Sequence, residues 1–251
     1  MRAAISTVSR QAEPAEFGDA GMRVWQGREK IVRQFSGIGK VFRNKLALGG
    51  RSPWSVPPKL QYCFTNADTG MTVFDPFRFV PRHAYAEGID LRLYTTSLNA
   101  AIYQLFQAAG LHERNEFWLK ELVRINEEEA AQAGRRPLPL WDFSDANTIT
   151  RDPVPLSTDP TPMRWYWEHS HYRKATGDLI LDRVFGYSDP KRLIPADFGV
   201  QLTSANVDQH IARAKAGLQA WAAANSELVE PIVRAGRTLK THSRQPEATC
   251  W

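Results

Sequence analysis

The feature that most constrains the fold is an alternation of helical and strand-like segments between residues 74 and 143. In chain order these are 74–87 (helix, stopped by Gly88), 89–94 (strand), 99–109 (helix), 115–133 (helix, stopped by Gly134) and 138–143 (strand). The helices follow from apolar residues three and four positions apart, and the first strand follows from apolar–polar alternation. Helices that separate strands are typical of parallel βαβ units, so the sequence predicts an α/β fold with a parallel sheet.

The flanking segments divide the chain into three parts. Residues 1–56 are rich in Arg, Gly and Ser and show little periodicity, so we expect a basic arm or loose subdomain there. Two more helices are predicted inside the α/β domain, at 174–185 and 204–224, the second with a continuation past Pro231. We place the α/β domain at 57–235 and a polar tail at 236–251.

Composition excludes several classes of protein. The net charge of +5 comes from 32 basic and 27 acidic residues, and no basic–aromatic motif stands out, so we expect no nucleic-acid partner. No apolar run is long enough to be a transmembrane helix, and the first residues lack the apolar core of a signal peptide. As written the sequence indicates the cytoplasm, whereas a missing N-terminus would allow an extracytoplasmic location, so the compartment stays unassigned.

Polar residues follow both predicted strands of the domain. Ser97 and Asn99 come after the first strand, and Asp142, Ser144 and Asn147 accompany the end of the second. Because chemistry in parallel sheets gathers at the carboxyl ends of strands, these five form a candidate polar site. The same residue types are favoured helix caps, so capping is an equally good interpretation for any one of them.

Residues 163–172 bring aromatic rings, a carboxylate and two imidazoles together. Glu168 and His171 are three positions apart, which puts them within hydrogen-bond reach on a turn that leads into the predicted helix at 174–185. A carboxylate on one imidazole nitrogen leaves the other nitrogen to act as a general base, so His171 and Glu168 are the candidate catalytic pair. The candidate binding residues beside them are Trp165, Tyr166, Trp167 and His169.

Two other interpretations of this segment stay open. In the first, the Glu168–His171 pair has a structural role alone and stabilises a loop, and the aromatic rings belong to the core. Glu168, His169 and His171 could instead offer a metal one carboxylate and two imidazoles, but no obvious fourth ligand lies nearby in the sequence. We therefore expect neither a metal nor a cofactor.

The stretch from Tyr166 to Tyr172, followed by Lys174, Gly177-Asp178 and Ile180-Leu181, resembles the last block of the SGNH/GDSL hydrolases. In that block an acid, two intervening residues and the catalytic histidine precede a glycine-containing helix. Residues 141–144 and the segment from Leu202-Thr203 are also similar to uncharacterised bacterial proteins of that superfamily. The resemblance covers about residues 70–235.

The resemblance implies a flavodoxin-like, three-layer α/β/α fold whose parallel sheet this chain leaves incomplete at its N-terminal edge. It implies ester hydrolysis or acyl transfer on a small molecule, a glycan or a lipid, and relatives can be membrane-anchored. Carried over, His171 would be the general base and Glu168 its orienting acid, where the family usually has Asp.

The chain departs from the family upstream of this block. No Gly-x-Ser nucleophile follows a first strand, and the glycine block and the Gly-x-Asn-Asp block are missing. Without a nucleophile the acyl-enzyme chemistry of the family cannot run. We expect an N-terminally shortened relative, while a serine from elsewhere, such as Ser97 or Ser144, is the other explanation. The alternative function is a non-catalytic remnant that binds a glycan or a partner through the surface of residues 165–167.

Overall fold

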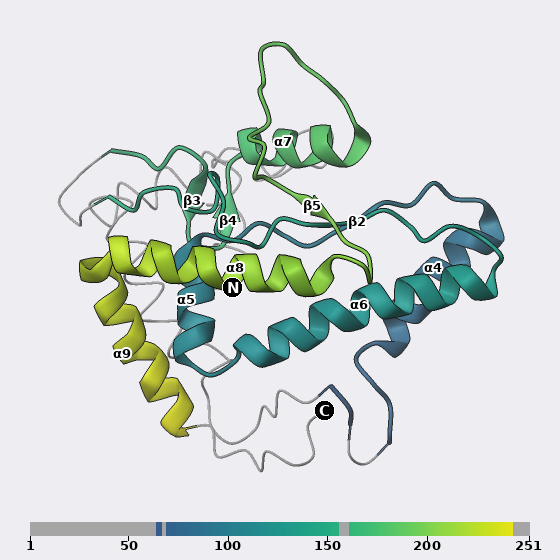
Figure 1. The fold of residues 1–251 in the computed structure, drawn as a ribbon, viewed down its shortest axis with the longest axis horizontal. Coiled ribbons are helices and arrows are strands. Elements are labelled where there is room, and N and C mark those ends of the chain that lie inside the picture. The colour runs from purple at the N-terminus through teal and green to yellow at the C-terminus, as the bar shows by residue number, and fades with distance from the viewer. Residues whose placement is uncertain (1–63, 67–68, 156–160, 243–251) are drawn as a thin grey trace, which may run out of the picture.

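The computed structural model of the protein describes residues 64–66, 69–155 and 161–242 (Figure 1). Within these ranges it is a mixed α/β fold, and the expected arm at 1–56 lies outside them. The described helices are α4 (Asp75–Glu87), α5 (Ala100–Ala108), α6 (His112–Gln132), α7 (Lys174–Phe185), α8 (Val207–Ala224) and α9 (Ser226–His242). The described strands are β1 (Leu93–Tyr94), β2 (Leu140–Asp142), β3 (Tyr166–Glu168), β4 (His171–Tyr172) and β5 (Val200–Gln201).

The main sheet is small and mixed, with strand order β1-β2-β5. The predicted parallel pair is confirmed, because β1 lies parallel to β2 with Leu93 opposite Leu140. The sheet is not parallel throughout the described residues, because β5 runs antiparallel to β2. The two residues of β5 are too few for an alternating pattern, which is why the sequence did not predict this strand.

Most helix boundaries follow the sequence pattern closely. α4 and α7 each end before a glycine in the left-handed conformation, Gly88 at φ 66° and Gly186 at φ 65°, as the glycine stops predicted. α8 begins at Val207 rather than at residue 204. After α8 the chain forms a separate helix, α9, which continues to His242 and so crosses residue 236, where a polar tail was expected to begin.

The first strand is shorter than predicted. Only Leu93 and Tyr94 pair in the sheet, although the alternation began at Ile89. The side chain of Ile89 is half exposed, and the backbone N–H of Leu91 donates locally to the carbonyl of Ile89 at 3.0 Å. The apolar–polar alternation therefore predicted a strand over residues 89–94, of which only Leu93 and Tyr94 have partners in the main sheet.

The alternation of side chains along β2 decides what lies on each side of the sheet. Leu140 packs with α6 and α8 in one apolar cluster, whereas Trp141 and Phe143 pack in a second cluster with α5 and α7. Since successive strand residues point to opposite faces, Asp142 points to the same side as Leu140, toward α8. Figure 1 shows α8 passing in front of α5 and running alongside α6, and α8 contacts both helices.

Candidate functional site

The segment from Tyr166 to Tyr172 is a β-hairpin and not a turn that leads directly into a helix. β3 and β4 pair antiparallel, with Tyr166 opposite Tyr172 and Glu168 opposite His171, and α7 begins two residues later. Residues 169 and 170 form the turn between the two strands. We call residues 168–171 the acid–histidine turn.

Hydrogen bonds from elsewhere in the chain hold this hairpin against the loop that follows β1. The backbone N–H of Asn99 donates to the carbonyl of His169 at 2.9 Å, and the hydroxyls of Ser97 and Tyr166 lie 2.7 Å apart in the core. The carboxylate of Asp152 accepts the backbone N–H of Trp165 at 2.7 Å. The acid–histidine turn therefore lies next to the loop after β1. This loop holds Ser97 and Asn99, which the sequence analysis named as part of the candidate polar site.

Glu168 and His171 make the contact that their spacing predicted. Nδ1 of His171 hydrogen-bonds to Oε1 of Glu168. The Glu168 side chain is 3% exposed and the His171 side chain is 47% exposed, so a buried acid holds a ring that reaches solvent. Because a carboxylate only accepts, Nδ1 carries the proton and Nε2 is the basic nitrogen of the neutral ring. No hydrogen bond to Nε2 is present among the described residues.

The serines of the described chain do not form a nucleophile–base pair with this histidine. Ser170 Oγ lies 3.0 Å from Nδ1 of His171, but it donates to Glu168 at 3.1 Å and approaches the nitrogen that the acid already occupies. Ser97 is fully buried against Tyr166, and Ser144 donates to Asp142 at 2.8 Å. A base needs a hydroxyl on its unprotonated nitrogen, so none of these three serines is placed as a nucleophile in this arrangement.

The aromatic residues of the segment divide into core and surface. Tyr166 is fully buried, and burial raises the pKa of its hydroxyl although the Ser97 hydrogen bond opposes this. Trp165 and Trp167 are partly exposed, and each carries a guanidinium over its ring, Arg164 at 4.5 Å and Arg173 at 4.0 Å. His169 Nδ1 lies 3.3 Å from Oε2 of Glu168. Of the four expected binding residues, the two tryptophans present a partly exposed ring and Tyr166 does not.

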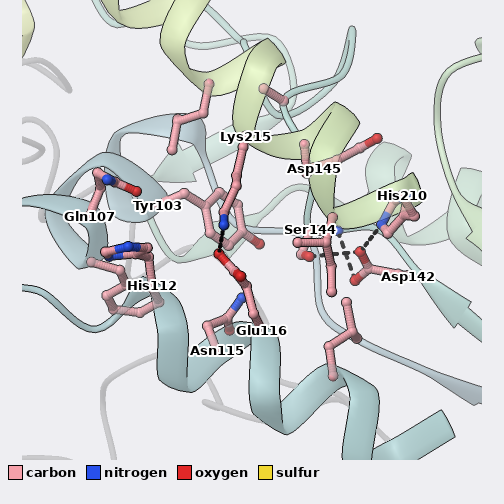
Figure 2. A pocket seen from close by; sticks show the side chains of 16 residues that line it. Tyr103, Gln107, His112, Asn115, Glu116, Asp142, Ser144, Asp145, His210 and Lys215 are labelled. Atoms are coloured by element: carbon pink, nitrogen blue, oxygen red, sulfur yellow. Dashed lines mark hydrogen bonds and ion pairs between the residues drawn. The ribbon is translucent and has the colours of Figure 1, made fainter. Parts of the chain in front are cut away.

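The predicted polar residues at the end of β2 belong to a second, buried cluster. Asp142 is 1% exposed and accepts hydrogen bonds from Thr95, from Ser144 and from Nε2 of His210, the last at 2.5 Å. Figure 2 shows the contacts with Ser144 and His210. Burial is the largest influence on the pKa of Asp142 and by itself raises it. The hydrogen bond and charge of His210, together with the hydrogen bonds from Thr95 and Ser144, outweigh burial and hold this pKa below its ordinary value. We call these four residues the Asp142 cluster.

The sequence analysis missed His210, the partner of Asp142. The histidine lies on α8 between Val207 and Ile211, which both pack in the apolar cluster beneath the sheet. A polar residue on the apolar face of a predicted helix was the available signal. The segment that supplies its acid lies 68 positions earlier, so only the fold brings the two together.

The two asparagines of the candidate site hold local backbone structure. Asn99 Oδ1 accepts the backbone N–H of Ala101 at 3.1 Å at the start of α5, while its Nδ2 donates to the carbonyl of Asp152. Asn147 Oδ1 accepts the backbone N–H groups of Ile149 and Thr150, both at 2.9 Å. For Asn99 the interpretation as a helix cap is confirmed, whereas Asn147 stabilises a turn at residues 148–151 that is not the start of a helix.

No family model, no curated protein and no solved structure matches the chain. In residues 64–66, 69–155 and 161–242 no three His, Cys, Asp or Glu side chains are grouped so that they could hold a metal ion. Within the same part of the chain no helix is both long and apolar enough to cross a membrane.

Proposed function

We propose that the chain belongs to the hydrolases in which a histidine steered by an acid activates a hydroxyl for attack on a carbonyl. Within that class we propose an SGNH-type protein that hydrolyses an ester of a small molecule, a glycan or a lipid, or transfers its acyl group. The observation that carries the proposal is the buried Glu168 carboxylate on Nδ1 of the half-exposed His171.

The geometry of the acid–histidine turn suits general-base work. Glu168 fixes the tautomer of the ring and would stabilise the imidazolium that forms when Nε2 takes a proton. Backbone and side-chain bonds of Ser170 to the same carboxylate, at 3.3 and 3.1 Å, restrict its rotation. Nε2 then faces an attacking hydroxyl that comes either from water or from a serine outside the described residues.

The finer fold belongs to the same proposal. Helices pack on both sides of β2: α6 and the start of α8 share one apolar cluster, and α5, α7, α9 and the end of α8 share the other. Helices on both faces of a sheet are what a flavodoxin-like α/β/α arrangement requires. The antiparallel β5 would then be an added edge strand, which is common on otherwise parallel sheets.

Turnover of p-nitrophenyl acetate by the full chain tests the role of the pair. We expect His171→Ala to lower the rate by about 10²-fold or more, in the range that a positioned general base contributes. Glu168→Gln keeps a hydrogen-bonding group next to Nδ1 but removes its charge, so the rate should fall by a smaller factor. His83→Ala is the matched control, since His83 is an exposed histidine of α4 stacked on Phe79.

Equal rates for the wild type, His171→Ala and His83→Ala would remove His171 from catalysis and leave only surface imidazole reactivity. A fluorophosphonate probe distinguishes the two sources of the hydroxyl. Covalent labelling followed by peptide mapping would identify a serine, whereas turnover without labelling would indicate that His171 activates water directly.

The second candidate function is a non-catalytic module that binds a glycan or a partner through Trp165 and Trp167. It is supported by the absence, in the described part of the chain, of a serine on Nε2 of His171. The guanidinium groups over both indole rings weigh against sugar stacking, because they already occupy one face of each ring.

A further inference from the structure

A cavity apart from the acid–histidine turn opens between α5, α6, α8 and the loop after β2 (Figure 2). Its apolar lining includes Phe106, Leu119, Ile211 and Leu218, and its polar lining includes Tyr103 and the Asp142 cluster residues Ser144 and His210. The space inside it amounts to about 80 Å³. Neither Glu168 nor His171 lines it.

The ionisable groups that line this cavity already have hydrogen-bond or ion-pair partners. Lys215 of α8 reaches Glu116 of α6 with 2.7 Å between Nζ and Oε1, and Figure 2 shows the pair beside Tyr103. The oxygens of Asp142 already accept hydrogen bonds from Thr95, from Ser144 and from Nε2 of His210. A charged ligand would lose hydration here and would have to displace these existing partners, and that loss is costly.

One further lining carboxyl, Asp145, lies beside these groups. Burial is the main cause that raises the pKa of this carboxyl, against a hydrogen bond from Asn147. Its Oδ1 already accepts that hydrogen bond from Nδ2 of Asn147, at 2.6 Å.

The volume of the cavity and a polar atom in its lining narrow the class of ligand further. An apolar cavity of about 150 Å³ accommodates benzene, so about 80 Å³ suits a chain of three or four carbon atoms. Nδ1 of the lining residue His112 is buried and has no hydrogen-bond partner among the described residues. A hydroxyl both donates and accepts, so it satisfies this nitrogen in either tautomer.

From these observations we propose that the cavity between α5, α6 and α8 is a binding site for an uncharged, short aliphatic alcohol group, free or as the end of a larger ligand. The site is independent of the proposed hydrolase function, because it shares no residue with the acid–histidine turn. For so few atoms the affinity of the isolated group is of millimolar order.

Methyl NMR of the full chain with three isosteric probes tests the site. We expect 1-butanol to shift the methyl signals of Leu119, Ile211 and Leu218, with butyrate and butylammonium binding about tenfold more weakly or less. Ala214→Leu places extra volume at a lining position of α8 and should abolish these shifts. Ala216→Leu is the matched control, the same exchange at an exposed position of the same helix, and should leave them unchanged.

The preference of the cavity for an uncharged ligand has its own test, which does not depend on whether Ala214→Leu folds. Lys215→Met removes the half-exposed cation and leaves Glu116 without its partner, so butylammonium should gain about tenfold over 1-butanol. The proposal is overturned if the three probes bind the wild type equally, if 1-butanol shifts none of the three methyl groups, if Ala214→Leu binds as the wild type does, or if Lys215→Met leaves the probe preference unchanged.

Discussion

At the scale of single residues, the same polar side chain can serve as a cap or as part of a reactive site, and its contacts decide which. Asn99 illustrates the first outcome: both ends of its amide bond the backbone, to Ala101 N–H and to the Asp152 carbonyl. We propose the second outcome for Glu168, whose buried carboxylate bonds a histidine that reaches solvent. The sequence predicted both residues as site candidates, Asn99 from its position after a strand and Glu168 from its spacing to His171, but it could not distinguish these two outcomes.

Replacement of Asn99 tests its structural role. Asn99→Ala should lower the free energy of unfolding by about 2 kcal/mol, since it removes a helix cap and leaves a buried N–H and a buried carbonyl without a partner. Asn99→Ser keeps a capping oxygen but cannot reach Asp152, so we expect about half that loss. Urea unfolding followed by circular dichroism measures both, and equal losses would contradict the role of the cap.

At the scale of secondary-structure elements, close packing of α9 on α5 holds the C-terminal helix in place. A Cβ at Gly236 would come within 2.4 Å of the Cβ of Ala108, so the two helices approach each other at this glycine. Gly217 of α8 differs, since its added Cβ would meet Ala146 at an ordinary 3.4 Å.

The two helical glycines should therefore respond to alanine with opposite signs. Gly236→Ala should destabilise the protein by about 1–2 kcal/mol, because overpacking outweighs the gain in helix propensity. Gly217→Ala should stabilise it by up to about 1 kcal/mol, because only the propensity gain remains. Thermal unfolding of both variants against the wild type measures this, and a stabilised Gly236→Ala would show that α9 does not pack there.

At the scale of the whole molecule, the Asp142 cluster links the sheet to α8. Asp142→Asn should lower the free energy of unfolding at pH 7 by about 3 kcal/mol, since it leaves buried His210 without its acid. Asp208→Asn on the same helix is the control, because the Asp208–Lys120 pair is exposed and should contribute less than about 1 kcal/mol.

The difference in free energy of unfolding between the wild type and Asp142→Asn should change with pH in a definite direction. The pKa of Asp142 is lower in the folded chain than in the unfolded chain, so the unfolded chain takes up the proton first as the pH falls. The stabilisation by Asp142 is thus complete above the unfolded pKa of about 3.9 and is lost as the pH falls through the folded pKa. The gap between wild type and Asp142→Asn in urea unfolding should be constant from pH 7 to 5 and shrink below pH 4, and a gap that widens in acid would contradict this.

Local sequence determined the helices, their glycine stops at Gly88 and Gly186, and the Glu168–His171 contact. Each of these depends on residues within a few positions of one another, so backbone preference and side-chain spacing suffice. Tertiary structure alone decided the antiparallel β5, the pairing of Asp142 with His210 and the cavity beside them. These features join segments tens of residues apart, and which segments meet is set by burial of the whole apolar surface, which no local pattern specifies.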